Sequence, residues 1–408
     1  MPSPQIRFKE FKDPLKLTNL DIAVEIMQSG LSRLLSDADI GMPVIRSNNL
    51  KDSRLDCTDV KYWHSKDTQG SNLDNYILRD GDLLVNFINS MAQIGKVALY
   101  KNILQRDVIF TTNILRLRFK PHVVNRYIFN LFQTDKYRKF IESITKPAVN
   151  QASFTTKEFK KFEFCLPSIQ EQTRIADLFE NFDKKLFLLN KKLELLILYK
   201  KGVMKQIFNQ EIRFKDENLQ NFPEWKKIPL NEFANIVGGG TPDTFNNVYW
   251  GGSIQWFTPT ELKRKYVSLS SRTITDLGLK NSSAKLLPKG AILFTSRATV
   301  GDVSIALNEC ATNQGFQSFV PRNSNSNEYL FYWLQNNKKL FLERASGSTF
   351  LEISKKEIEK ILISKPAPDE QMKIANFLSS IDKKIDNVRS QYEKASLFKQ
   401  GLLQQMFI

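Results

Sequence analysis

The sequence contains few of the residues from which metal and redox sites are built. Only three cysteines and two histidines occur among its 408 residues. Cys57, Cys165 and Cys310 are far apart, and their spacing fits neither a zinc site nor a disulfide framework. We therefore expect no metal site in this chain, and the scarcity of cysteine fits the reducing conditions of the cytoplasm.

Apolar segments long enough to enter a membrane are missing as well. No run reaches the roughly 18 consecutive apolar residues that indicate a membrane-spanning helix. The first residues, 1–11, carry charge throughout and contain no apolar core of the kind found in secretion signals. We expect a cytoplasmic protein that does not associate with a membrane.

Motifs that would identify an enzyme are nearly absent. No GxxxxGK[ST] loop and no GxGxxG loop occurs, so the sequence has no recognisable nucleotide-phosphate site. The triplet Gly238–Gly240, followed by Thr241-Pro242, predicts a turn or loop. An adenine methyltransferase would need an Asn/Asp-Pro-Pro-aromatic loop to hold a flipped base, and the sequence has no Pro-Pro pair. We therefore expect no catalytic residue.

One short pattern leaves an enzymatic alternative open. Pro242-Asp243 followed by Glu261-x-Lys263 has the residue order of metal-dependent nucleases, in which two carboxylates hold Mg²⁺ and a lysine assists the attacking water. The pattern occurs once, and patterns this short often arise by chance. A Mg²⁺-dependent nuclease that uses Asp243, Glu261 and Lys263 is the alternative to a non-catalytic function.

Basic residues are in clear excess. The 59 lysines and arginines outnumber the 43 aspartates and glutamates, which gives a formal net charge of +16. Basic side chains that neutralise phosphates release the counterions condensed on nucleic acid, so this excess suits a polyanionic partner. A generally basic surface can also arise without such a partner, and the charge alone does not decide between the two.

A long internal repeat organises the chain. Its C-terminal parts match without a gap, whereas further upstream the match thins and the register drifts. A series of matches in the same order indicates a tandem duplication. The matched pairs are Ile6-Arg7-Phe8 with Ile212-Arg213-Phe214, Glu171-Gln172 with Glu370-Gln371, Asp183-Lys184-Lys185 with Asp382-Lys383-Lys384, and Lys200 with Lys399.

Each copy ends in a segment with the spacing of a coiled-coil helix. Apolar residues recur at seven-residue steps over 175–207 and 374–406, and Lys200 and Lys399 interrupt both copies at the same place. Two helices that pack separately on their own domains fit this shared length less well than two helices that pack on each other. The seam residues are Ile175, Phe182, Leu189 and Leu196 in one copy and Ile374, Ile381, Val388 and Leu402 in the other.

The globular stretches have a mixed α and β pattern. Residues 291–297 and 316–321 predict short strands, and residues 327–345 predict a helix whose counterpart lies at 125–144. Several polar segments suit contact with DNA, because basic, hydroxyl and aromatic groups can reach phosphates and base edges. The candidate DNA contacts are Lys61, Tyr62, Trp63, Lys66, Lys263, Arg264, Lys265, Ser296, Arg297, Ser348 and Thr349.

With these features the chain resembles, over its whole length, the specificity subunits of type I restriction-modification systems. The resemblance is most specific at Leu166-Pro167-x-x-x-Glu171-Gln172-x-x-Ile175-Ala176 and at its counterpart, which begins at Pro366. Trp225 and the stretch 239–242 are similar to a typical domain opening in that family. In the first copy, Ser29-Gly30 occupies the corresponding place without the Thr-Pro, so that domain departs from the pattern at its start.

The resemblance implies a duplicated, pseudo-twofold α/β fold of mixed α and β type. Target-recognition domains at 1–167 and 209–367 would each be followed by a conserved spacer helix, at 168–208 and 368–408, and the two helices would form an antiparallel coiled coil. Each domain would bind one half of a bipartite, asymmetric target in double-stranded DNA. Two modification (methyltransferase) subunits with S-adenosylmethionine, and restriction subunits that use ATP and Mg²⁺, would do the chemistry, so this chain would carry no cofactor of its own.

Overall fold

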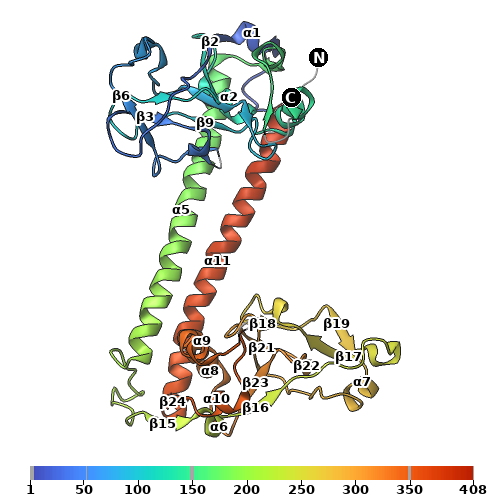
Figure 1. The fold of residues 1–408 in the computed structure, drawn as a ribbon. Coiled ribbons are helices and arrows are strands. Elements are labelled where there is room, and N and C mark those ends of the chain that lie inside the picture. The colour runs from blue at the N-terminus through green and yellow to red at the C-terminus, as the bar shows by residue number, and fades with distance from the viewer. Residues whose placement is uncertain (1–3, 52, 148–150, 348–350, 408) are drawn as a thin grey trace. The chain divides into compact units, whose positions relative to one another are not determined.

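The computed structural model describes residues 4–51, 53–147, 151–347 and 351–407 and divides the chain into two compact units (Figure 1). Unit 1 comprises residues 1–190 and 390–408, and unit 2 comprises residues 191–389. The chain passes between them once inside helix α5 (Ile169–Phe208) and once inside helix α11 (Pro368–Met406). Each long helix therefore belongs to unit 1 in one part and to unit 2 in the other.

Unit 1 is built on a four-stranded antiparallel sheet in the order β2-β11-β7-β9. In a second sheet, β3 pairs parallel with β10 and antiparallel with β6. The pair β1-β14 fastens the start of the domain to the strand that leads into α5. The strands are β1 (Lys16–Asn19), β2 (Val24–Ser29), β3 (Gly41–Ile45), β6 (Lys61–His64), β7 (Leu83–Asn86), β9 (Val97–Leu99), β10 (Ile109–Phe110), β11 (Ile114–Phe119) and β14 (Glu163–Leu166), with the short β4 (Leu50–Lys51), β5 (Arg54–Leu55), β8 (Ile88–Asn89), β12 (Lys146–Pro147) and β13 (Ala152–Ser153).

Unit 2 repeats this topology. Its main sheet has the order β16-β23-β20-β21-β18, its second sheet has the order β19-β17-β22, and β15 pairs with β24. In the second sheet, β17 again pairs parallel with one neighbour and antiparallel with the other. The duplication and the mixed α and β class predicted from the sequence are thus confirmed. The strands are β15 (Lys226–Pro229), β16 (Ala234–Gly238), β17 (Trp250–Phe257), β18 (Tyr266–Val267), β19 (Arg272–Ile274), β20 (Ile292–Phe294), β21 (Val303–Ala306), β22 (Cys310–Thr312), β23 (Gln317–Pro321) and β24 (Leu362–Lys365).

In each unit two helices follow the main sheet, whereas the sequence predicts a single helix at that place. In unit 1 the break falls before Thr134, whose side chain accepts a hydrogen bond from Tyr137 N and so begins a new helix. In unit 2 it falls at Asn337, whose side-chain amide donates to the carbonyl of Trp333 in the preceding helix. The helix pairs are α2 (Asn125–Leu131) with α3 (Asp135–Ile144), and α8 (Asn327–Asn336) with α9 (Lys338–Arg344). The short helices are α1 (Leu20–Ala23), α4 (Thr156–Phe159), α6 (Leu230–Phe233), α7 (Asp276–Lys280) and α10 (Lys355–Glu359).

Both long helices contribute to the core of each unit. In unit 1, Ile175 and Phe179 of α5 join Leu403 and Met406 of α11 in one apolar cluster with the main sheet. In unit 2, Val203 and Ile207 of α5 join Ile374 and Leu378 of α11 in the corresponding cluster. Since each such side chain contributes roughly 1.5–3 kcal/mol when it leaves water, the helices are held firmly to both units.

The repeated Glu-Gln motif fastens each long helix to its domain. Glu171 accepts two hydrogen bonds of 2.7 Å from Arg7, and Gln172 bonds the backbone at Val124, His122 and Pro167. Unit 2 has the same arrangement. There Arg213 and Trp225 donate to Glu370, and Gln371 bonds the backbone at Ser326 and Pro366. Within each copy, the arginine of the Ile-Arg-Phe motif therefore contacts the glutamate of the Glu-Gln motif.

The two seam lysines form reciprocal ion pairs between the long helices. In unit 1, Lys399 Nζ of α11 lies 2.6 Å from Asp183 Oδ1 of α5. In unit 2, Lys200 Nζ of α5 lies 2.7 Å from Asp382 Oδ1 of α11. Within each unit the helices run antiparallel, because residues late in one helix contact residues early in the other. The eight predicted seam residues are all buried or half-buried.

No helix in the described part of the chain is both long and apolar enough to cross a membrane. The two longest helices carry charged residues at short intervals, and α5 alone has Glu180, Asp183, Lys184 and Lys185 within 180–185.

The Glu370 anchor leads to a stability prediction. Glu370→Gln keeps the shape of the side chain but removes the negative charge that faces Arg213, so we expect the free energy of unfolding to fall by about 2 kcal/mol. Glu393→Gln on the exposed surface of α11 is the matched control and should change it by less than about 0.5 kcal/mol. Equal effects in urea denaturation would contradict the anchoring role.

Candidate nucleic-acid interface

A basic groove of about 780 Å³ lies in unit 2, between α5, the segment 262–265 and the start of α9. Seven of its sixteen lining residues are lysine or arginine, and Asp302 is the one acidic residue among them. Three of the basic residues belong to ion pairs: Lys200 with Asp382, Lys265 with Glu328, and Lys338 with Asp302.

Four cations of the groove keep their charge available. Among the described residues no ion pair engages Lys201, Lys205, Lys263 or Arg264, and all four side chains are exposed. Lys201 and Lys205 lie four residues apart on α5 and therefore share one face of the helix. Such a group of unpaired cations suits the phosphates of a nucleic-acid backbone.

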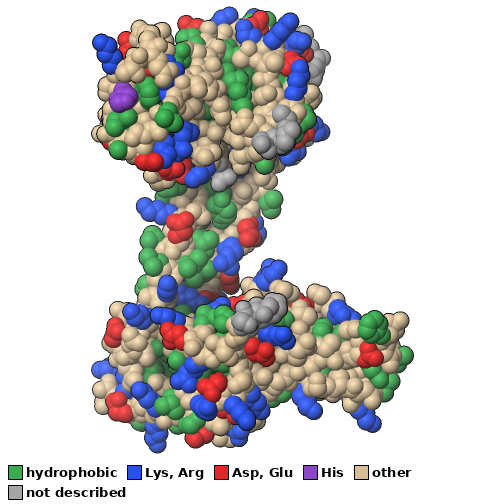
Figure 2. Space-filling view, viewed as in Figure 1, with side chains coloured by type: hydrophobic (Ala, Val, Ile, Leu, Met, Phe, Trp, Pro, Cys, Tyr) green, Lys and Arg blue, Asp and Glu red, His purple; other side chains and the backbone are tan. Residues whose placement is uncertain are grey.

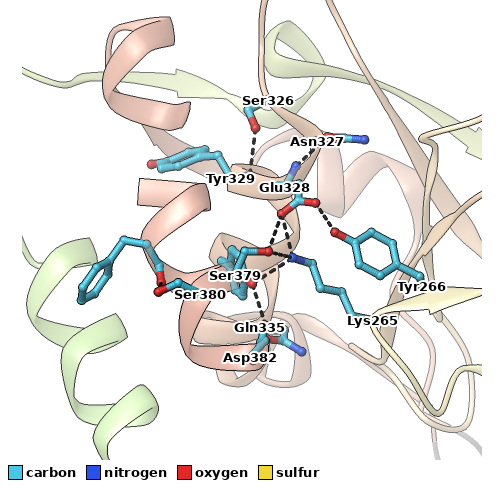
Figure 3. A network of polar contacts seen from close by, with 12 residues as sticks. Lys265, Tyr266, Ser326, Asn327, Glu328, Tyr329, Gln335, Ser379, Ser380 and Asp382 are labelled. Carbon is cyan, nitrogen blue, oxygen red and sulfur yellow. Dashed lines mark hydrogen bonds and ion pairs between the residues drawn. The ribbon is translucent and has the colours of Figure 1, made fainter. Parts of the chain in front are cut away.

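Lys265 has a different environment from its two neighbours in sequence. Its Nζ lies 2.7 Å from Glu328 Oε2, 2.9 Å from the hydroxyl of Tyr332 and 2.7 Å from Ser379 Oγ (Figure 3). Tyr332 in turn donates to Asp382, the partner of Lys200. Lys265 is thus a structural residue that links the groove to the long helices, and its side chain is not free to contact DNA.

Burial and hydrogen bonding set the protonation of this network. Burial lowers the pKa of Lys265, and the hydrogen bond to Glu328 opposes that shift. Burial alone would raise the pKa of Glu328, but bonds from Lys265 and Tyr266 outweigh it and leave the pKa lowered. Burial raises the pKa of Tyr332 far above its usual range, so its hydroxyl remains a donor to Asp382. The network therefore joins a buried lysine to a carboxylate and to two hydroxyl groups by direct hydrogen bonds.

In unit 1 the candidate contacts Lys61, Tyr62 and Trp63 lie on β6, and Lys66 follows that strand. Lys66 is exposed, Tyr62 is half-buried and Lys61 forms an ion pair with Asp37. Trp63 is only 6% exposed and donates from its ring nitrogen to Asp67. Trp63 is therefore a core residue rather than a surface available to DNA.

The remaining candidates lie in unit 2. Ser296 is 1% exposed, so its side chain has no surface for a DNA contact. Arg297 is exposed, with its Nε 3.7 Å from Glu352. Ser348 and Thr349 lie outside the described residues.

The two carboxylates of the nuclease alternative have structural roles, whereas its lysine, Lys263, is one of the exposed cations of the groove. Glu261 accepts hydrogen bonds from Thr258 N, Thr258 Oγ1 and Ser271 N, which lowers the pKa of its carboxyl although burial opposes this. Asp243 accepts from Phe245 N in a tight turn. No group of three or more His, Cys, Asp or Glu side chains suited to a metal ion occurs within the described ranges.

Three groove cations were not predicted from the sequence. Lys201, Lys205 and Lys338 are distant in sequence from Lys263 and Arg264, and only the packing of α5 and α9 beside that segment brings them together. The four-residue spacing of Lys201 and Lys205 could have indicated a basic face on α5, but not that this face lies beside the segment 262–265.

Comparison with known proteins identifies the family. A family model described as the type I restriction modification DNA specificity domain matches the chain twice, over residues 34–198 and 223–395. The chain belongs to this family. The specificity subunits of type I systems are non-catalytic, and neither this match nor the contacts of Asp243 and Glu261 support the nuclease alternative.

Individual specificity subunits are similar to this chain, either over nearly its whole length or over about half of it. The putative MjaX specificity subunit of Methanocaldococcus jannaschii is 28% identical over 97% of this chain and 93% of its own length. The MjaIX specificity subunit of that organism is 36% identical over 49% of this chain and 48% of its own length. The crystal structure of the S subunit from M. genitalium matches with a TM-score of 0.62 and 15% identity, over 100% of this chain and 99% of that one. At that identity the structural match concerns the fold.

The basic groove leads to a prediction about DNA binding. Replacing Lys201, Lys205 and Lys263 together by alanine removes three unpaired cations, so we expect weaker binding to any duplex and a salt dependence whose logarithmic slope is smaller by roughly 2–3. Fluorescence anisotropy at several salt concentrations measures both.

The matched control replaces Lys226, Lys227 and Lys356, which are exposed and lie outside the groove. It removes the same charge. If both triple variants lost the same affinity and slope, only the net charge would matter and the groove would not be a binding surface.

Proposed function

We propose that this specificity subunit binds double-stranded DNA at a bipartite, asymmetric target, with each unit contacting one half-site. The observation that carries the proposal is the repeated topology of two units that both match the specificity domain. The residues shared by the copies hold the long helices to the domains and to each other, as Glu171, Glu370, Lys200 and Lys399 illustrate. The candidate contact segments differ between the copies, as two different half-sites would require.

The proposal includes modification subunits that dock on the long helices. In both copies a leucine and an aromatic residue precede the seam lysine and are more than half exposed: Leu198 (65%) and Tyr199 (54%), and Leu397 (68%) and Phe398 (58%). Apolar side chains are visible on the surface of the helices in Figure 2. Exposed apolar groups at equivalent positions suit two copies of one partner.

The chemistry then belongs to the partners. Modification subunits would supply S-adenosylmethionine for the methylation of adenines, and restriction subunits would supply ATP- and Mg²⁺-dependent translocation and cleavage. In this chain the described residues serve to bind DNA and to hold partners, and we propose no cofactor for it.

The long helices fix the spacer in this proposal, because they alone carry the chain from one unit to the other. Inserting three heptads after Asn190 and three after Arg389, which are equivalent positions, lengthens both helices by about 32 Å. That is close to the roughly 34 Å of one DNA turn, so both half-sites stay on one face. We expect the methylated target to keep both half-sites and to gain a spacer about one turn longer.

Mapping methylated adenines in a host that carries the chain and its partner subunits measures this result. The control inserts the same residues into α5 alone, which breaks the antiparallel seam and should abolish methylation. An unchanged spacer in the double insertion would contradict the proposed role of the helices.

A further inference from the structure

The two most exposed large apolar side chains of the described residues occupy corresponding loops of the two units. Leu34 is 90% exposed and lies between β2 and β3, and Phe245 is 96% exposed and lies between β16 and β17. Both loops contain eleven residues, at 30–40 and 239–249. The two loops differ in sequence, yet each carries one almost fully exposed apolar residue, which costs solubility and contributes nothing to the core.

Both loops start at a fixed point. Gly30 and Gly239 begin them, and a Cβ on either glycine would lie 2.0 Å from a backbone oxygen, of Phe110 and Asn313 respectively. The next residue in each loop donates its N–H to the last residue of the adjacent strand, Leu31 to Phe110 and Gly240 to Thr312. The equivalence of the two loops thus rests on backbone contacts as well as on length.

In unit 1 the residue before Leu34 is locked in place. Arg33 makes two hydrogen bonds to the buried Asp67, at 2.9 and 2.7 Å, and a third to Ser71 Oγ. The Arg33 guanidinium holds the pKa of Asp67 well below its usual range, so the pair stays ionised. Leu34 is therefore presented to solvent by a rigid support, beside the loop that carries the exposed Lys66.

In unit 2 the Phe245 loop is held by an aromatic and basic group. Asp243 accepts from Phe245 N through its side chain and from the Trp250 ring nitrogen through its carbonyl, both at 3.0 Å. The guanidinium of Arg272 stacks over that Trp250 ring at 3.5 Å from its centroid. Arg272 is exposed, and no ion pair engages it in the part of the chain that the structure describes. An arginine pre-oriented on an aromatic ring suits a guanine edge or a phosphate.

We propose that Leu34 and Phe245 are the apolar groups with which each unit contacts the bases of its own half-site. An apolar side chain among short polar and basic ones can pack on a thymine methyl group or enter a base step, and either contact depends on sequence. The inference rests on the proposed function, because it requires that each unit binds one half-site.

Duplex DNA fits these loops better than a protein partner does. A protein-docking surface needs a contiguous apolar patch. Leu35, which follows Leu34, is half-buried and packs on the core, and the other neighbours of Leu34 in the loop are polar: Ser32, Arg33, Ser36 and Asp37. The two loops also lead into the second sheet of each unit, on which Lys61 and Tyr62 of unit 1 and Arg272 of unit 2 lie.

Half-site preference in genomic methylation tests the proposal. The full chain, with its modification subunits, is expressed in a host and the methylated adenines are mapped. We expect Phe245→Ser to relax one half-site by roughly tenfold in preference at one or two base pairs, and Leu34→Ser to do the same at the other half-site only. Leu17→Ser and Leu362→Ser replace exposed leucines of the β1-β14 and β15-β24 pairs and should leave the target unchanged.

A second measurement tests the proposal even where a serine variant assembles poorly with the modification subunits. A photo-crosslinking phenylalanine analogue at position 245 or 34 of the assembled complex should crosslink to host genomic DNA. Wild-type target preference in both serine variants, or crosslinks to a protein subunit in place of DNA, would overturn the inference while the proposed function stands. A wild-type complex that methylates no bipartite site would overturn the proposed function itself.

Discussion

The reciprocal ion pairs between α5 and α11 are the constraint on which the rest of the structure depends. Aspartate precedes lysine by 17 residues in both helices, so one antiparallel register brings Lys399 to Asp183 and Lys200 to Asp382. The lysine side chains are only 10% and 16% exposed. Burying an amine this deeply without a partner costs several kcal/mol of folding free energy. Because both pairs share one register, a shift of either helix by one turn would break both and leave two buried lysines without partners.

The residues that fasten the long helices to the domains differ from the residues proposed to contact DNA. Arg7 with Glu171, and Arg213 with Glu370, fasten the helices to the domains and recur in both copies. Two unpaired cations of the groove, Lys201 and Lys205, correspond to Gln400 and Gln404 in the other helix, and the exposed loop residue is leucine in one unit and phenylalanine in the other. A duplicated chain can thus keep one geometry while its two units acquire different DNA contacts, which is what a bipartite asymmetric target requires.

The long helices and the common topology of the two units could be predicted from the sequence, because the residues that form them are periodic or repeated. The heptad spacing predicted the helices and their seam, and the duplication predicted the common topology. The roles of the seam lysines could not be predicted, since their aspartate partners lie on the other helix. Trp63, Lys265 and Ser296 appeared to be DNA contacts in the sequence, but burial and the partners Asp67 and Glu328 are tertiary properties that local composition does not encode.

A charge-reversal cycle at the unit 1 ion pair tests the central claim most directly. Asp183→Lys and Lys399→Asp alone each place like charges together, and the free energy of unfolding should fall by roughly 2–4 kcal/mol. The double variant restores an opposite pair, and we expect it to recover more than half of that loss, with a target spacer identical to that of the wild type. Additive losses in the double variant would contradict the account, because the two side chains would then not act on each other.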